Sequence, residues 1–504
     1  MSTVRRNTIA NYAGQAWSAL VSLAFVPVYI AYVGIEAYGI IGFFVALQSL
    51  FTLLDLGLSA ALNRELARRS QSSPAGETRD LVRTLEWIYW PIGMAIVLAV
   101  WLAARPLAEH WLRTVSIPVD RAAQALMLLG VAAALQWPVS FYTGGLSGLQ
   151  RQVLLNVLSA VFATLRALGA VGVLALVSPT LEAFLYWQIA LSAAQSVCFA
   201  WVMWRVLPRA SAPARFSAAL LRSIGGFAAG ITGVTLLSFL LTQTDRILLS
   251  KILALDQFGV YALASSAALA LGRLVYPIVN AVYPRYSQLV AAGNGVALVD
   301  FYHRTNQAIA AIVLPVAAIA VLFAKDILWL WTRNPAIAAG AAPVLALLVA
   351  GTAVNGLMNL PYALQLAYGW IRLSFWTNVV AVCFVVPAIW IAGTRFGGVG
   401  AAAAWLALNL GYLAVGIPLM HRRLMTGEMW RWYLADVLPP LAAAALVAAL
   451  WRLVLPDLLG FTGLALLLGA TATTLAAGVA AAPFPRSVAR AWWSARRGAP
   501  IAHG

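Results

Sequence analysis

Charged residues are scarce in this chain, and acidic residues are the scarcest. Only 10% of the 504 residues are charged, whereas 62% are hydrophobic and the mean hydropathy is +0.86. A water-soluble domain of this length and composition would expose a very large apolar surface. The composition therefore excludes a soluble protein and indicates a polytopic membrane protein.

Cysteine is nearly absent. Cys198 and Cys383 are the two cysteines, and both fall inside apolar runs at a spacing that suggests neither a disulfide nor a metal site. The 33 basic residues outnumber the 16 acidic ones and give a net charge of +17. The basic residues are spread over many short loops, however, and not gathered in one nucleic-acid-binding module. We therefore predict no cofactor, no metal site and no nucleic-acid partner.

Long polar segments are also lacking, so no soluble domain fits between the apolar runs. A bilayer core of about 30 Å needs about 20 apolar residues per helix. The run at 9–33 is too long for a signal peptide and has no A-x-A cleavage site, so we expect it to be retained. The sequence predicts an all-α fold with fourteen spans, at 9–33, 38–61, 85–104, 123–147, 154–178, 183–204, 223–245, 258–282, 305–324, 338–366, 373–394, 399–420, 436–455 and 460–482.

The distribution of basic residues predicts the orientation of these spans. A cytoplasmic N-terminus places most of the Lys and Arg residues in inner loops, which obeys the positive-inside rule. An even number of spans then returns the C-terminus to the cytoplasm. The tail at 483–504 is rich in arginine and tryptophan, which fits either an interfacial segment on anionic lipid or a frayed cationic end.

An internal repeat appears when the numbering is shifted by 220 residues. Residues 33–40 then lie over 253–260 with an acid, an aromatic residue and a glycine in register. Six spans per copy give two parallel lobes with a cavity between them, although chance similarity between membrane segments is an alternative. The predicted parts are a six-helix lobe at 1–206, a cytoplasmic linker at 207–222, a second six-helix lobe at 223–421, two additional helices within 422–482, and a cytoplasmic basic tail at 483–504.

Arg166 and Arg273 each lie near the middle of a long apolar run. A charged side chain at the bilayer centre costs about 2.5–3.5 kcal/mol on insertion scales, so each is a functional hypothesis by default. The planar guanidinium donates two hydrogen bonds to phosphate oxygens and keeps its proton, which suits a diphosphate on a lipid. The alternative is that backbone carbonyls or a carboxylate satisfy each arginine for structural reasons.

Other intramembrane polar residues are candidates for coupling, gating or sugar contact. Asp55 could take up and release a coupling proton, or form a helix–helix hydrogen bond or an ion pair. The acid and base at the end of the seventh span could form a gate latch or an interfacial anchor. The predicted substrate-binding residues are Arg64, Arg166, Arg246, Arg273, Tyr276 and Asn280, and the predicted coupling or gating residues are Asp55, Glu65, Gln243 and Asp245.

Three short motifs carry a resemblance to a known family, over about residues 7–420. They are LDLGL at 54–58 with RELA at 64–67, GLQRQ at 148–152, and TDRILLSK at 244–251 followed by FGVYA at 258–262. Because of the order and spacing of these motifs, the chain resembles the polysaccharide transporter family. This family belongs to the multidrug/oligosaccharidyl-lipid/polysaccharide exporter superfamily and includes the Wzx-type O-antigen flippases.

The resemblance implies a two-lobed flippase of the bacterial inner membrane. Its cargo would be an oligosaccharide or repeat unit, of an O-antigen, other lipopolysaccharide or exopolysaccharide, linked to undecaprenyl pyrophosphate. Coupling by antiport with protons or another cation is implied, and a glycan polymerase and a chain-length regulator are candidate partners. The related lipid II flippases carry arginines in the first span, where this chain has Asn11 and Gln15, so lipid II is the less favoured cargo.

Three other functions are weighed against the flippase. A drug or metabolite antiporter of the same fold would need acidic cavity walls for cationic drugs, whereas this interior is at least as basic as acidic. A membrane glycosyltransferase or polymerase would need a sizeable outer loop or a paired acidic motif, and the longest outer loop predicted is only 105–122. A non-transporting scaffold would tolerate neutral replacement of Arg166, Arg273 and Asp55. We therefore expect a transporter and not an enzyme.

Overall fold

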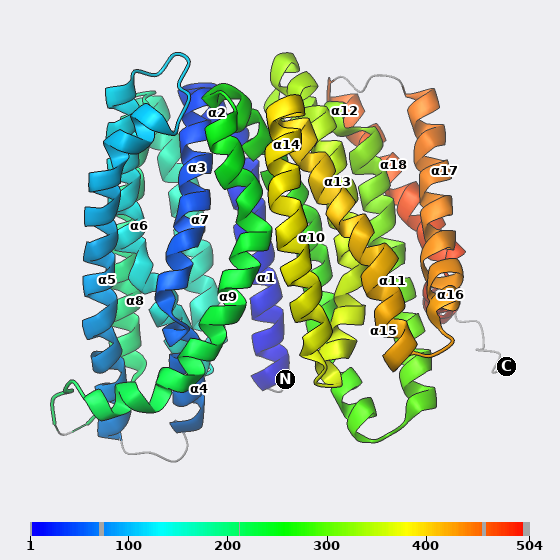
Figure 1. Cartoon of the computed structure of the whole chain (residues 1–504), viewed down its shortest axis with the longest axis horizontal. Helices are drawn as coiled ribbons and strands as arrows, with labels where there is room; N and C mark the ends of the chain where they lie inside the picture. The colour runs from blue at the N-terminus through cyan, green and yellow to red at the C-terminus, as the bar shows by residue number, and fades with distance from the viewer. Residues whose placement is uncertain (1–2, 70–74, 211, 456–459, 497–504) are drawn as a thin grey trace. The chain divides into compact units, whose positions relative to one another are not determined.

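A computed structural model describes residues 3–69, 75–210, 212–455 and 460–496 (Figure 1). These residues form helices, with one isolated bridge between Arg113 and Ala254 and no β-strand in the described ranges. The predicted all-α membrane fold is confirmed. The chain divides into two compact units, Met1–Ala262 and Leu263–Gly504, which we call unit 1 and unit 2.

Unit 1 contains the helices up to α9 and the start of α10. They are α1 (Thr3–Ala24), α2 (Val26–Val33), α3 (Ile35–Phe51), η1 (Thr52–Asp55), α4 (Leu58–Arg69), α5 (Ala75–His110), α6 (Val119–Gly148), α7 (Gln152–Leu176), α8 (Leu181–Val206) and α9 (Ala218–Ile252). Helix α6 lies at the centre of this unit and packs against α4, α5 and α8.

Unit 2 contains most of α10 and the remaining helices. They are α10 (Leu255–Ala291), α11 (Gly295–Leu322), α12 (Ala324–Thr332), α13 (Pro335–Ala367), α14 (Ile371–Gly411), η2 (Tyr412–Gly416), α15 (Ile417–Leu424), α16 (Met429–Arg431), η3 (Trp432–Val437), α17 (Leu438–Val454), α18 (Gly460–Ala481) and α19 (Pro483–Arg496). Helix α11 is central here and packs against α13, α17 and α18.

Twelve helical stretches among the described residues are long and apolar enough to cross a membrane. The sequence predicts fourteen, because it counts α9 as a span and divides α14 into two. Within α14 the two predicted spans are visible as two arms that meet at Gly397, whose φ of 61° and ψ of −144° are not helical. The exact number of fourteen and the lobe boundaries stay predictions, and α9 packs against α3, α4 and α5 of unit 1.

Two glycines related by the predicted repeat pack against each other in unit 1. A Cβ atom on Gly39 of α3 would lie 2.4 Å from the carbonyl oxygen of Leu255, and a Cβ atom on Gly259 of α10 would lie 2.2 Å from that of Ile35. Each glycine thus meets the carbonyl four residues before the other glycine. This reciprocal contact is what two parallel copies of one motif produce when they meet at equivalent positions, and small residues at both positions let the backbones approach closely.

We expect Gly39→Ala and Gly259→Ala each to lower stability by about 1–3 kcal/mol, because the added methyl group overlaps backbone atoms that cannot rotate away. The measurement is thermal unfolding of the purified protein in detergent. Gly172→Ala on α7 is the matched control, since a Cβ atom there has nothing within 4 Å. If Gly39→Ala and Gly172→Ala had the same unfolding temperature as the unchanged protein, the close approach would be disproved.

Candidate functional site

The second predicted span is interrupted, and its only intramembrane acid lies at the interruption. Helix α3 passes into the short η1 segment, after which Leu56 has a left-handed φ of 50° and Gly57 a φ of 71°. A left-handed non-glycine residue costs roughly 1–2 kcal/mol. The carboxylate of Asp55 helps to hold the turn, because it accepts hydrogen bonds from the Ser59 hydroxyl at 2.6 Å and from the Ser59 N–H at 3.4 Å. The sequence located Asp55 but did not predict the break.

A cavity of about 560 Å³ lies beside this break, with walls from α3, η1, α4 and α6. The hydroxyl of Ser59 also lies 2.6 Å from the Tyr89 hydroxyl. The buried indole N–H of Trp137 has no hydrogen-bond partner within the described part of the chain. The polar side chains on the cavity wall are those of Gln48, Ser49, Asp55, Ser59, Gln136, Trp137, Ser140 and Thr143. The acid therefore lies on the wall of a hollow that has both polar and apolar side chains, inside a membrane-spanning bundle.

Arg166 on α7 is satisfied by uncharged side chains of α8. Its guanidinium donates to Gln188 Oε1 at 2.7 Å, to Gln195 Oε1 at 2.9 Å and, more weakly, to Ser192 Oγ at 3.4 Å. No carboxylate pairs with it among the residues that the structure describes. Hydrogen bonds hold the guanidinium in place while its positive charge remains unneutralised, so the site retains the capacity to bind an anion.

Three of the predicted substrate-binding residues share one face of α10. Arg273, Tyr276 and Asn280 follow each other at intervals of three and four residues, about one helical turn each, and all three are exposed, Tyr276 with 63% of its surface accessible. A cation, a phenol and an amide therefore form a single stripe of hydrogen-bonding groups along this helix. These three predicted substrate-binding residues therefore lie next to one another in the structure.

The predicted gating residues form different pairs from those the sequence suggested. Asp245 on α9 accepts a hydrogen bond from the Tyr261 hydroxyl at 2.5 Å, while its other oxygen and the side-chain oxygen of Gln243 are buried without a partner in the described ranges. Arg246 is half-buried on the same helix. At the end of α4, buried Glu65 pairs with Arg68 at 2.9 Å, and Arg64 is exposed.

A buried cluster of acids and a histidine in unit 2 was missed by the sequence reasoning. His303 on α11 is only 1% exposed, and its two ring nitrogens lie 2.5 Å from Asp436 Oδ2 and 2.9 Å from Glu428 Oε2. Gln307 donates to the second oxygen of Asp436 at 2.9 Å and accepts from the backbone N–H of Phe484 at 2.9 Å. Both ring nitrogens of His303 thus lie within hydrogen-bond distance of a carboxylate from the C-terminal segment. The cluster therefore ties η3 and α19 to α11.

The predicted repeat is the feature of the sequence that could have pointed to this cluster. His303 lies 220 residues after Arg83, and both begin a polar turn at the start of a long apolar helix. In unit 1 the corresponding turn is also networked, because Arg83 pairs with buried Glu86 at 3.0 Å and Glu86 accepts from Trp204 Nε1 at 2.8 Å. The acids that contact His303 come from residues beyond the repeat, which is why alignment of the copies did not reveal them.

Asp436→Asn should destabilise the protein by about 3–5 kcal/mol, since it breaks a fully buried pair by removing the carboxylate that contacts His303 and accepts from Gln307. The measurement is again thermal unfolding in detergent. Asp300→Asn removes an acid of the same type from the exposed pair that Asp300 forms with Arg304 on the same helix, and we expect that change to cost at most about 1 kcal/mol. Equal effects of the two substitutions would contradict a structural role for the buried cluster.

Comparison with known proteins assigns most of the chain to known families and to one fold. A family model described as polysaccharide biosynthesis protein matches residues 4–290, and a MatE family model matches residues 231–391. No curated protein matches the chain.

Solved structures match over most of the chain at low identity. A lipid II flippase, MurJ, in an inward closed conformation matches with a TM-score of 0.71 at 13% identity, covering 94% of this chain and 98% of its own. An inward-facing multidrug resistance MATE family transporter matches with a TM-score of 0.68 at 16% identity, covering 82% of this chain and 96% of its own. A variant of the Vibrio cholerae MATE transporter VcmN matches with a TM-score of 0.57 at 17% identity, covering 86% and 100%.

Proposed function

Because the chain belongs to the polysaccharide biosynthesis protein family, we propose that it is a flippase for oligosaccharides linked to undecaprenyl pyrophosphate. It carries the repeat unit of an O-antigen or an exopolysaccharide from the cytoplasmic to the periplasmic leaflet of the inner membrane by alternating access. Both termini lie in the cytoplasm. The fold that it shares with a lipid II flippase supports a lipid-linked cargo.

The observation that carries the proposal is the uncompensated charge of Arg166. Its guanidinium is fixed by three neutral side chains of α8 and keeps a positive charge within a spanning helix. Such an arrangement is expensive in hydrocarbon and becomes favourable when a phosphorylated headgroup supplies the counter-charge. A purely structural arginine would gain more from a carboxylate partner.

The stripe on α10 suits the rest of the headgroup. Arg273 can hold a phosphate, while Tyr276 and Asn280 on the same face can contact sugar hydroxyls. Arg64 at the inner end of the first lobe would attract the pyrophosphate from the cytoplasmic leaflet, and Arg246 would meet it on the way out. The cycle makes and breaks no covalent bond, so the protein acts as a carrier and not as an enzyme. A glycan polymerase and a chain-length regulator are its proposed partners.

Asp55 is the proposed coupling residue. It lies at a break in a spanning helix, on the wall of a cavity that also carries other polar side chains, and discontinuous helices are where transporters bind coupling ions. Proton antiport through this carboxyl would drive export. Glu65, Gln243 and Asp245 would act at the ends of their helices as gating groups, and the Gly39–Gly259 contact would close one end of the pathway.

A second candidate function is a multidrug or metabolite antiporter, which the MatE match over residues 231–391 favours. Efflux of cationic drugs would require acidic groups where this chain has Arg166 and Arg273. Resistance to cationic dyes in cells that express the protein, without any effect on surface glycan, would support the antiporter over the flippase.

Arg273→Ala should reduce surface glycan by about tenfold or more in cells whose glycan depends on this protein, because a charge-assisted contact worth about 1.5–3 kcal/mol is lost. Arg273→Lys should restore only part of the glycan, since an ammonium lacks the planar fork. Arg285→Ala, at an exposed arginine on the same helix, is the control. Full glycan in an Arg273→Ala strain with normal protein in the membrane would refute the assignment.

Asp55→Asn should remove the dependence of flipping on a proton gradient. Asparagine keeps an oxygen that can accept from Ser59, so the turn is preserved while the titrating group is lost. The measurement is flipping of a lipid-linked saccharide in proteoliposomes with and without an imposed pH gradient. A variant that still responds to the gradient as the unchanged protein does would rule out Asp55 as the coupling group.

A further inference from the structure

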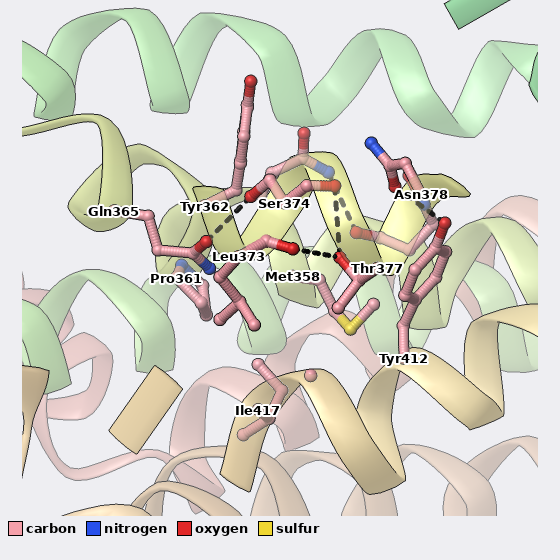
Figure 2. Close-up of a pocket in the computed structure, with 13 residues that line it drawn as sticks. Met358, Pro361, Tyr362, Gln365, Leu373, Ser374, Thr377, Asn378, Tyr412 and Ile417 are labelled. Atoms are coloured by element: carbon pink, nitrogen blue, oxygen red, sulfur yellow. Dashed lines mark hydrogen bonds between the residues drawn. The ribbon is translucent and has the colours of Figure 1, made fainter. Parts of the chain in front are cut away.

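Unit 2 contains a polar pocket that none of the functions above uses. It has a volume of about 200 Å³ and lies among α13, the first arm of α14, η2 and the start of α15 (Figure 2). Its polar wall is made of Asn355, Asn359, Gln365, Ser374, Thr377, Asn378 and Tyr412. Polar side chains on membrane-spanning helices are costly unless they are satisfied or functional.

The side-chain amides of Gln365 and Asn378 in this pocket each have N–H donors that make no hydrogen bond within the described part of the chain. Ser374 donates to Gln365 Oε1 at 2.7 Å and Tyr412 donates to Asn378 Oδ1 at 2.8 Å, as Figure 2 shows. These bonds occupy the amide oxygens and fix the direction of each side chain. The amide nitrogens donate to no acceptor within the described ranges, although Gln365 is only 8% exposed. These N–H groups line the pocket and can donate to a ligand oxygen.

The chemistry of the pocket disfavours divalent cations and phosphates. None of the residues that line it is Asp, Glu, Lys, Arg or His. Divalent cations prefer carboxylate oxygens, and phosphates prefer arginine or lysine. Amides and hydroxyls in a neutral wall match the hydroxyl groups of a sugar.

An apolar groove of about 610 Å³ continues directly from the pocket. It runs between the two arms of α14, and its wall includes Trp376, Val380 and Phe384. The pocket and the groove share four residues, Leu373, Thr377, Tyr412 and Gly416. The shared wall includes η2, a π-helical segment, and such segments occur frequently at functional sites. A polar pocket that opens into an apolar groove fits one molecule with a polar head and a hydrocarbon chain.

We propose that this pocket and groove bind an uncharged glycolipid, with its sugar against Gln365 and Asn378 and its chain between the arms of α14. The site goes beyond the proposed transport function. The pyrophosphate of the proposed cargo has no cation here, so the glycolipid is a second ligand that occupies unit 2 while the cargo is carried elsewhere.

The test is photolabelling of the full-length protein in phosphatidylcholine nanodiscs. The probe is an alkyl glucoside with a diazirine in its chain, and the comparison probe has the same chain with a phosphate head. We expect the glucoside probe to label peptides within 371–389 and 404–419, and unlabelled alkyl glucoside to displace it. Equal labelling by the phosphate probe, which would indicate ordinary lipid contact, or displacement by free glucose alone, which would indicate a sugar site without a chain, would each overturn the proposal.

Two substitutions and a matched control locate the ligand. Gln365→Leu removes the spare amide and should reduce labelling by about fivefold, the range for one or two lost hydrogen bonds. Ala407→Phe fills the groove from its exposed side and should reduce labelling similarly without disturbing the fold, whereas Ala403→Phe, one turn away and outside the groove, should not. Unchanged labelling of Ala407→Phe refutes the proposal. Arg273→Ala should keep normal labelling, so failure of the flippase assignment is distinguishable from failure of this one.

Discussion

A bilayer offers a polar group no hydrogen-bond partner, so each polar side chain on a spanning helix must be satisfied by another helix, by water in a cavity, or by a cargo. Arg166 is the clearest case in this protein. Its hydrogen bonds to α8 satisfy the donors of the guanidinium without neutralising the charge. The protein thus fixes the position of the Arg166 guanidinium, and the proposed anion neutralises its charge. This division allows a carrier to hold its site in shape when the cargo has left.

The two copies of the predicted repeat differ at the positions of the proposed functional residues. Asp55 corresponds to residue 275, and Arg273 lies two residues from that position. The first copy breaks its helix at Leu56 and Gly57, whereas the second copy has Pro277 after Tyr276 and α10 continues as a helix. If Asp55 and Arg273 act as proposed, an acid at a break in one copy and a base on a continuous helix in the other give the coupling ion and the anionic cargo separate binding groups.

Much of the fold could be predicted from the sequence, because hydrophobic runs and glycine positions report directly on burial. The turn at Gly397 separates two predicted spans, and the repeat register is matched by the contact between Gly39 and Gly259. The break at Leu56 could not be predicted, since a leucine in an apolar run favours a continuous helix and the left-handed turn depends on the hydrogen bonds of Asp55. Contacts with the rest of the fold, and not local sequence preference, determine the backbone conformation at such positions.

The buried cluster in unit 2 explains how helices beyond the repeat are attached. In the first copy, Glu86 is satisfied by partners from within that copy. The corresponding residue of the second copy is Asn306, which is neutral and accepts from Trp432 of η3. The acid is instead supplied from outside the repeat by Asp436, which contacts His303. Asn306 supplies no acid at this position and the C-terminal segment supplies Asp436 instead, so the C-terminal helices are part of the packing of unit 2 and not an appendage to it.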